Sequence, residues 1–317
     1  MRAVFLDFGT VSSGDLDTGP LERVVPGLVT HEQTARAEIT PRIAGFEAVF
    51  ANKCVIDRAT IVANPQLRII ALTATGVDNV DLAAAREAGV AVCNLRDYCT
   101  PSVVQHVFAM LLALTHRLRD YQALVQDGRW EAAGQFSVFP YPIRELQGRL
   151  LGIVGYGALG RAVAQAATAF GMQVAIANRP GGESVAGRHD LDELLPRLDV
   201  LSLHCPLTEA TRGLINASRL ARMKADAVLI NTARGALVEA AALADALRNH
   251  RLGGAGIDVL EHEPPPAGHA LLDPSIPNLI LTPHIAWAAR ESRQRCLDEL
   301  AQNVESFLTG GRRNRVV

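Results

Sequence analysis

One segment, residues 150–170, limits the possible folds of this 317-residue chain more than any other. An apolar run at 150–154 leads directly into Gly155, Gly157 and Gly160, and helix-forming residues continue without proline to about position 170. A strand, a glycine turn and a helix in this order are typical of a dinucleotide-binding fold. The GxGxxG spacing alone also arises by chance, so the flanking strand and helix carry the prediction.

Each part of this turn has a physical task at a dinucleotide. Gly155 permits the tight turn, Gly157 lets the backbone approach a pyrophosphate, and Gly160 lets the helix pack closely on the strand. Ala158 and Leu159 begin the helix, whose N-terminal N–H groups and dipole would bind the phosphates.

The pattern around this motif predicts an α/β protein with two parallel sheets. Apolar runs typical of buried strands recur after the motif at 173–177, 200–203, 227–230, 255–258 and 279–281, with helical segments such as 158–170 and 238–249 between them. Together with 150–154 they make six strands, the number expected for a doubly wound sheet. Earlier runs at 3–8, 48–50, 67–72 and 90–93, alternating with helices at 57–63 and 81–88, predict another parallel sheet.

Two long helices suggest how the domains are divided. A mainly apolar helix predicted from Thr100 to about Val125 separates them, and a last amphipathic helix at 288–308 is expected to return to the first one. We therefore predict a discontinuous, flavodoxin-like substrate domain made of residues 1–100 and 286–317. A Rossmann dinucleotide-binding domain, residues 101–285, is inserted in it.

Composition argues against several classes of partner. The formal net charge of −2 creates no field that would attract nucleic acid or an anionic membrane. The arginines at 312, 313 and 315 are expected to form a solvated, frayed tail. The longest apolar block, 107–114, is too short to span a membrane, and the apolar start is too short for a signal peptide. Five cysteines without a CxxC pair or a metal-type cluster predict no metal site and a reducing, cytoplasmic location.

The residue that reads the cofactor's ribose should lie about twenty residues after the glycines, at the end of the next strand. Asn178 and Arg179 stand there, and no carboxylate does. A neutral Asn178 would not repel a 2′-phosphate, and Arg179 could pair with one. We therefore expect NADP(H) or NAD(H), with NADP(H) favoured, although Arg179 could instead be a solvated loop residue.

Reduction of a carbonyl by hydride also needs a cation to hold the substrate and an acid to protonate the oxygen. In an open α/β sheet both should lie just beyond the carboxyl ends of strands. Arg234 follows the strand at 227–230, Asp258 and Glu263 follow the next, and His284 follows the last. These residues are the candidates for catalysis.

Taken together, the motifs resemble the D-isomer-specific 2-hydroxyacid dehydrogenase family over essentially the whole chain. They are Gly76-Val77-Asp78-Asn79-Val80-Asp81, His204-Cys205-Pro206-Leu207-Thr208, Asn231-Thr232-Ala233-Arg234-Gly235, Asp258-Val259-Leu260 with Glu263-Pro264, and Pro283-His284. The stretches Thr100-Pro101-Ser102-Val103-Val104-Gln105-His106 and His284-Ile285-Ala286-Trp287-Ala288 are similar to the glycerate dehydrogenase/hydroxypyruvate reductase branch.

This resemblance implies roles for the three catalytic candidates. Arg234 would hold the substrate carboxylate or carbonyl through its permanently charged guanidinium. His284 would protonate the keto oxygen during reduction and act as the base in reverse. Glu263 would favour the charged imidazolium and fix the ring, unless it is only a solvated loop carboxylate.

The resemblance also implies the remaining contacts. Asp258 would face the nicotinamide end of the cofactor, and the flanks would be lined by His204, Pro206, Thr208, Thr232 and Ala233. Backbone groups at Thr75, Gly76 and Val77 would bind the substrate carboxylate from the first domain. Trp287 would either narrow the pocket toward two- or three-carbon acids or pack in the core.

The implied activity is reduction of a small 2-keto acid, of the glyoxylate or hydroxypyruvate class, to the D-2-hydroxy acid. Two rivals share this fold. One is a formate or phosphite dehydrogenase, and the other is a nucleotide-sensing corepressor that binds cofactor without turnover. The long apolar helix after Pro101 suggests a homodimer, as relatives have.

Overall fold

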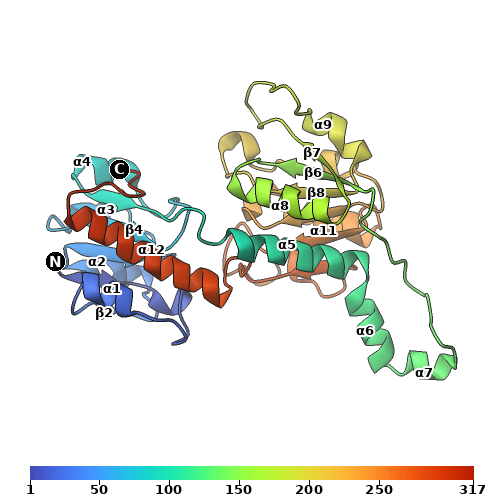
Figure 1. Ribbon diagram of the computed structural model, residues 1–317, viewed down its shortest axis with the longest axis horizontal. Helices are drawn as coiled ribbons and strands as arrows, with labels where there is room; N and C mark the ends of the chain where they lie inside the picture. The colour runs from blue at the N-terminus through green and yellow to red at the C-terminus, as the bar shows by residue number, and fades with distance from the viewer. The chain divides into compact units, whose positions relative to one another are not determined.

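The computed structural model describes residues 1–317. It divides into two compact units, and each holds its own parallel sheet with helices packed on it (Figure 1). The first unit consists of Met1–Cys99 and Trp287–Val317, and the second of Thr100–Ala286. The predicted fold class, α/β with two parallel sheets, is confirmed.

The sheet of the first unit has five parallel strands in the order β2-β1-β3-β4-β5. Their bounds are Val29–Thr30, Ala3–Phe5, Ala48–Ala51, Ile69–Leu72 and Ala91–Cys93 in that spatial order. This is the flavodoxin-like 2-1-3-4-5 arrangement. No apolar run predicts β2, because this strand has only two residues and both are exposed. The strand predicted at 3–8 ends at Phe5, because Phe8–Thr10 forms a 3₁₀ turn.

The helices of the first unit are α1 (Gly19–Val24), α2 (Ile39–Ile43), α3 (Arg58–Val62), α4 (Leu82–Glu87) and α12 (Arg290–Leu308). Two of them begin where an acidic residue predicted a start. The Asp57 side chain accepts the Thr60 N–H at 2.9 Å, and the Asp81 side chain accepts the Ala84 N–H at 2.8 Å. Each carboxylate therefore satisfies a backbone donor that the first helical turn leaves unpaired.

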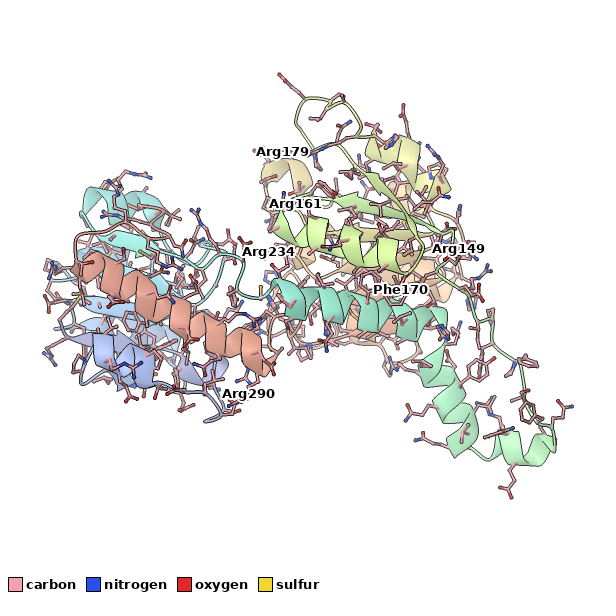
Figure 2. The ribbon with its side chains drawn as sticks, viewed as in Figure 1. Arg149, Arg161, Phe170, Arg179, Arg234 and Arg290 are labelled. Atoms are coloured by element: carbon pink, nitrogen blue, oxygen red, sulfur yellow. The ribbon has the colours of Figure 1, made fainter.

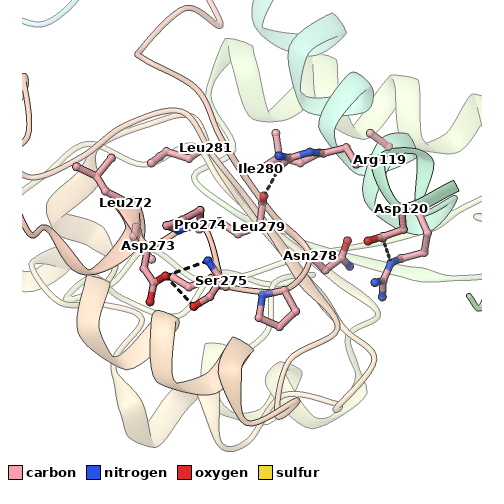
Figure 3. Close-up of a pocket in the computed structure, with 15 residues that line it drawn as sticks. Arg119, Asp120, Leu272, Asp273, Pro274, Ser275, Asn278, Leu279, Ile280 and Leu281 are labelled. Carbon is pink, nitrogen blue, oxygen red and sulfur yellow. Dashed lines mark hydrogen bonds and ion pairs between the residues drawn. The ribbon is translucent and has the colours of Figure 1, made fainter. Parts of the chain in front are cut away.

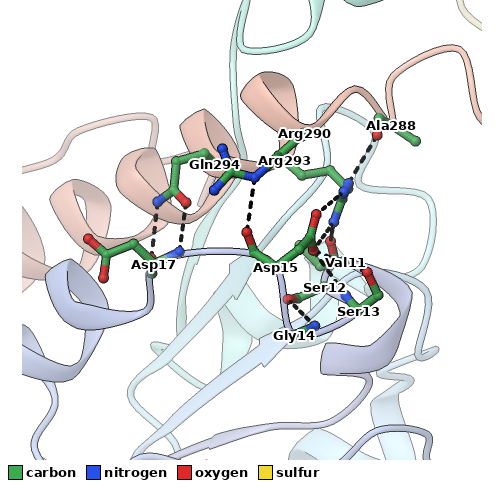
Figure 4. Close-up of polar contacts among 10 residues, drawn as sticks. All are labelled: Val11, Ser12, Ser13, Gly14, Asp15, Asp17, Ala288, Arg290, Arg293 and Gln294. Atoms are coloured by element: carbon green, nitrogen blue, oxygen red, sulfur yellow. Dashed lines mark hydrogen bonds and ion pairs between the residues drawn. The ribbon is translucent and has the colours of Figure 1, made fainter.

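The terminal helix is fastened to the loop that follows β1. Two nitrogens of Arg293 donate to the two carboxylate oxygens of Asp15 at 2.8 and 2.6 Å, and Gln294 exchanges hydrogen bonds with the Asp17 backbone (Figure 4). The hydrogen bond from Arg293 holds the pKa of Asp15 well below its usual range. This ion pair joins the two chain segments that make up the first unit.

The C-terminal residues are ordered, so the prediction of a frayed tail is wrong. Arg315 forms an antiparallel bridge with Cys93, and the Val316 N–H donates to the Val92 carbonyl at 2.8 Å. Val317, like Val316, packs against the core of the first unit. The tail covers β5, whose outer edge would otherwise present unpaired N–H and C=O groups.

The sheet of the second unit contains the six predicted strands, all parallel, in the order β11-β10-β9-β8-β6-β7. The strands are β6 (Leu150–Val154), β7 (Gln173–Ile176), β8 (Val200–Leu203), β9 (Val228–Asn231), β10 (Gly254–Ile257) and β11 (Leu279–Leu281). The chain enters this sheet at β6, moves to the edge strand β7 on one side and continues with β8 on the other. An isolated parallel bridge between Ala177 and His189 extends the β7 side. The chain thus adds strands first on one side of β6 and then on the other. Open α/β sheets bind ligands at the point where the order of strands reverses in this way.

The main helices of this unit are α5 (Thr100–Thr115), α6 (Leu118–Gln126), α7 (Arg129–Ala133), α8 (Ala158–Ala169) and α11 (Ala240–Arg248), with short turns α9 (Leu191–Leu194) and α10 (Ala217–Leu220). The prediction of one helix to Val125 is wrong, because Arg117 has a left-handed backbone with φ of 53°. This residue ends the helical ladder without glycine or proline. Its side chain bonds to Asp120 at 2.5 Å and lies over the Tyr141 ring, which stabilises the break.

The apolar face of α5 is part of the core of its own unit, with Val103, Val107, Met110, Leu111 and Leu114 buried. None of the helices has both the length and the apolar character that a membrane span would need.

Candidate active site

The glycine turn has the shape that its sequence predicts. Gly155 has φ of +95°, and a Cβ there would lie 2.5 Å from the His204 carbonyl. A Cβ on Gly160 would collide with the Gly155 carbonyl oxygen. By contrast, a Cβ on Gly157, directly before α8, would meet no atom within 4 Å. Two glycines are therefore required by packing, and the third leaves open space at the N-terminus of the helix.

Two buried polar atoms beside this turn have no partner within the protein. They are Nδ1 of His204, just after β8, and the hydroxyl oxygen of Thr232, just after β9. The other ring nitrogen of His204 is 2.8 Å from the Ser202 hydroxyl, and burial lowers the pKa of His204 to about 4. A neutral imidazole and a hydroxyl without partners are unusual in a finished core. Together with the open space at Gly157, they fit a dinucleotide with its many polar groups.

The end of β7 carries no carboxylate. The Asn178 side chain accepts the Val185 N–H at 3.0 Å, which shapes the following loop, and Arg179 is exposed. Figure 2 shows Arg179 at the same end of the second unit as Arg161 and Arg234, opposite Arg149. Three arginine side chains therefore lie at this end of the second unit, and the predicted cofactor preference stays a prediction.

The other predicted cofactor residues lie on short turns after β8 and β9. Pro206 and Thr208 belong to a turn braced by Thr211, whose hydroxyl donates to the Pro206 carbonyl at 2.9 Å and accepts the Thr208 N–H at 2.7 Å. Ala233 donates its N–H to the buried Asn231 side chain at 3.0 Å. Asn231 thus sets the turn that leads to Arg234, a task that the motif alone did not reveal.

Arg234 directly follows this turn, and its own backbone carbonyl is also held in place by a hydrogen bond. The Asn231 amide donates to the Arg234 carbonyl at 2.9 Å. A Cβ on the next residue, Gly235, would collide with the backbone of Leu260, so the loops after β9 and β10 touch. The structure therefore brings the Arg234 loop against the loop that ends in Glu263.

Glu263 and His284 lie 21 positions apart in the sequence, yet their side chains are in contact. Oε2 of Glu263 lies 2.6 Å from Nδ1 of His284, and Oε1 accepts the Leu260 N–H at 2.9 Å. The side chains are 32% and 26% exposed, so the pair is open to a small molecule. His284 adopts a left-handed backbone with φ of 57°, and its N–H donates to the Asp258 carbonyl at 2.8 Å.

The side chain of Asp258 is hydrogen-bonded to the loop that carries His284. It is only 1% exposed and accepts hydrogen bonds from the Thr282 hydroxyl at 2.5 Å, the Ile285 N–H at 2.9 Å and the Ala286 N–H at 2.8 Å. Three such bonds satisfy a buried carboxylate. The expected contact between Asp258 and a nicotinamide stays a prediction.

The predicted substrate residues of the first unit lie after β4 and before α12. The Thr75 carbonyl accepts the Asn94 amide at 2.7 Å, and Gly76 and Val77 follow in the same loop. Trp287 packs against the core of the first unit, with its ring edge-on to Tyr98 at 6.3 Å between centroids. Their substrate contacts stay predictions.

A separate hollow of about 530 Å³ lies at the start of α6 and along β11 (Figure 3). Arg119 crosses it and donates to the Leu279 carbonyl at 2.8 Å. None of the predicted site residues lines this hollow, so it is distinct from the candidate site.

Comparison with known proteins supports the same assignment. Residues 108–286 match the family model "D-isomer specific 2-hydroxyacid dehydrogenase, NAD binding domain". The chain is 43% identical over 279 residues to a glycerate dehydrogenase of Methylorubrum extorquens, with 88% of each chain covered. It is 37% identical over 316 residues to a hydroxypyruvate reductase of Blautia hydrogenotrophica, with 98% of each covered.

A solved structure agrees along the full length. The D-lactate dehydrogenase of Aquifex aeolicus, complexed with NAD and lactic acid, matches 100% of this chain and 99% of its own, with 27% identity and a TM-score of 0.85. The glycine turn, the order of strands and these relatives agree, and the chain belongs to the D-isomer specific 2-hydroxyacid dehydrogenase family of oxidoreductases.

Proposed function

We propose that this enzyme reduces a small 2-keto acid, of the glyoxylate or hydroxypyruvate class, to the D-2-hydroxy acid. The observation that carries the proposal is the 2.6 Å contact between Glu263 and His284, on loops at the carboxyl edge of the sheet that bears the glycine turn. The names of the glycerate dehydrogenase and hydroxypyruvate reductase relatives point to the same substrate class.

Three side chains divide the work on the substrate. A nicotinamide cofactor bound at the glycine turn would supply or take up the hydride. Because Nδ1 of His284 faces Glu263, the proton for the keto oxygen must be carried on Nε2. Glu263 orients the ring and favours the charged imidazolium. Arg234 holds the substrate carboxylate or carbonyl with the forked donors of its guanidinium.

Substitution of the acid tests this assignment directly. His284→Ala is expected to reduce turnover nearly to zero while cofactor affinity, measured by fluorescence titration, stays close to that of the wild type. His262→Ala is the matched control, because His262 is exposed in a neighbouring loop and has no assigned role. A His284→Ala enzyme that kept a tenth of wild-type turnover would rule out the acid role.

We further propose that the enzyme accepts NADP(H) as well as NAD(H), with NADP(H) favoured. Asn178 brings no negative charge to the end of β7, and the exposed Arg179 is available for a 2′-phosphate. Arg179→Ala should lower kcat/KM for NADPH by about tenfold and leave NADH nearly unchanged. Arg197→Ala, an exposed change that precedes β8 and so lies toward the opposite edge of the sheet, is the control. A strong preference of the wild type for NADH would contradict the proposal.

We propose that the space left for the substrate limits it to small acids. We propose that Thr75, Gly76 and Val77 bind the substrate carboxylate through the backbone, and that Trp287 limits the length of the substrate. Rates with glyoxylate, hydroxypyruvate and pyruvate should therefore exceed those with a bulky aromatic keto acid. The reverse order of rates would overturn this part of the proposal.

We infer that the chain forms a homodimer, through a different surface from the one first expected. The apolar face of α5 is occupied within its own unit. The segment 118–148, which contains α6 and α7, instead exposes large apolar side chains, with Phe136 at 96% and Phe139 at 81%. A second copy covering these rings would remove apolar surface that a monomer rarely exposes in such density.

A further inference from the structure

Helix α5 holds both ends of the loop that carries His284. The hydroxyl of the buried Ser102 donates to the Ala286 carbonyl at 2.6 Å. Nε2 of His106 lies 3.1 Å from the hydroxyl oxygen of Thr282. Ser102 and His106 are four residues apart, so they project from the same face of the helix. The segment 282–286 is thus hydrogen-bonded to helix α5 at its first and its last residue.

The direction of these hydrogen bonds follows from the number of protons available. The Thr282 hydroxyl has one proton, and its short 2.5 Å contact with the Asp258 carboxylate uses it. Toward His106 the same oxygen can only accept, so Nε2 of His106 carries a proton and donates it. Two consecutive hydrogen bonds therefore run from His106 to Thr282 and from Thr282 to Asp258. The same carboxylate accepts the N–H groups of Ile285 and Ala286.

This loop needs external support because of the backbone at its centre. His284 has φ of 57°, a conformation that a residue with a Cβ adopts only when its surroundings impose it. The ring must also stay in contact with Glu263 at 2.6 Å. A shift of the loop by an ångström would move the proposed acid away from its partner and from the substrate.

We propose that Ser102 and His106 form a positioning clamp, the α5 clamp, which keeps the 282–286 loop in the conformation that catalysis requires. Neither residue touches the reacting atoms; both act through the loop. The proposal rests on the proposed function, since it assumes that His284 is the acid. It also gives a task to Ser102 and His106, two of the polar side chains in the first two turns of a mainly apolar helix.

A purely structural alternative is also available for His106. Its Nε2 is 3.6 Å from Oδ1 of Asp258, so it could serve only to balance a buried carboxylate. In that case its loss would destabilise the protein without a selective effect on turnover. The two readings are separated by comparing stability, binding and kcat in the same variants.

The first experiment compares His106→Phe with His106→Gln, because the glutamine amide can still donate to Thr282. His106→Phe should lower kcat by about tenfold or more while cofactor affinity stays within about twofold. His106→Gln should recover kcat to within about threefold of the wild type. His116→Phe is the matched control, since His116 is exposed near the end of the same helix. If His106→Phe retains full kcat, or if His106→Gln is as impaired as His106→Phe, the clamp is refuted.

The second experiment approaches the same link from the loop. Thr282→Val removes the hydroxyl, and Thr282→Ser keeps it. If the link is shared, adding His106→Phe to Thr282→Val should cause little further loss of kcat, whereas independent losses that multiply would overturn the proposal. If a variant at one of these two positions folds poorly, the variants at the other position still test the link.

Amide hydrogen exchange tests the clamp without any substrate. In cofactor-free enzyme, the Ile285 and Ala286 N–H groups should exchange at least about tenfold faster in His106→Phe than in the wild type. Unchanged exchange at both amides would refute the clamp. A wild type that reduces no 2-keto acid would instead refute the proposed function, and the exchange result would still decide whether α5 holds the loop.

Discussion

Replacing Glu263 by glutamine is expected to weaken catalysis through a single reversed hydrogen bond. In the enzyme, Oε2 of Glu263 lies 2.6 Å from Nδ1 of His284, and Oε1 accepts the Leu260 N–H at 2.9 Å. A glutamine can keep the second contact with its carbonyl oxygen. Its NH₂ group would then face Nδ1 of His284 and oppose a proton there, so the charged imidazolium loses its partner.

The size of the effect follows from the kind of bond that is lost. A hydrogen bond to a charged group contributes about 1.5–3 kcal/mol, and about 1.4 kcal/mol is a factor of ten in rate. The full range would be about 10- to 150-fold. Because the two side chains are 32% and 26% exposed, solvent screens part of this energy, and we expect kcat/KM to fall by about 10- to 40-fold.

The assay is steady-state oxidation of NADPH and NADH with hydroxypyruvate and glyoxylate, together with a cofactor titration and a thermal melt. Glu261→Gln is the matched control, because Glu261 stands in the same loop and pairs with the surface residue Arg212. The control should leave kcat/KM within about twofold of the wild type. Cofactor affinity and melting temperature should be nearly unchanged in both variants.

Two results would refute this reasoning. One is a Glu263→Gln enzyme whose kcat/KM stays within twofold of the wild type, which would mean that the carboxylate does not support the imidazolium. The other is an equal loss in Glu261→Gln, which would mean that the loop and not the contact with His284 is responsible.

Three further predictions concern stability, cofactor binding and assembly. Because the pKa of His204 is lowered to about 4, the folded state disfavours a proton that the unfolded chain takes up below about pH 6.5. The free energy of unfolding should therefore fall as the pH falls below about 6.5. Between pH 7.5 and pH 5, urea unfolding should show a loss of this free energy that is about 2 kcal/mol larger in the wild type than in His204→Gln. An equal loss in both proteins would contradict the lowered pKa of His204. Gly157→Ala should leave the melting temperature within about 2 °C of the wild type and weaken cofactor binding by about tenfold or more. Gly160→Ala should instead lower the free energy of unfolding by about 1–3 kcal/mol or more. The opposite pattern would mean that the cofactor does not approach the backbone at Gly157. Changing Phe136 and Phe139 to serine should convert a dimer to a monomer in light scattering, and an unchanged mass would exclude this surface as the interface.

Local chemistry in the sequence was enough to predict most elements of the fold. The apolar runs located β6, β8 and β11 to the residue, because strands buried on both faces are continuous apolar segments. Asp57 and Asp81 marked the starts of two helices, because their carboxylates bond backbone donors three residues ahead.

Other elements depended on contacts between distant residues, and the sequence did not reveal them. The break at Arg117 has no glycine or proline, and it is stabilised by Asp120 and by the Tyr141 ring. The C-terminal residues looked like a solvated tail, because arginines are usually solvated. Their order comes from pairing with β5, which no local pattern announces.

The candidate site divides in the same way. Glycine spacing, the cation at Arg234 and the histidine after the last strand were legible in the sequence, since each follows from local backbone geometry or from side-chain type. The pairing of Glu263 with His284 was expected only from the family resemblance. Its distance, the left-handed backbone of His284 and the grip of Ser102 and His106 on the loop were decided by the tertiary structure. The physical reason is that hydrogen bonds between loops depend on how strands and helices pack, which residue order along one segment does not encode.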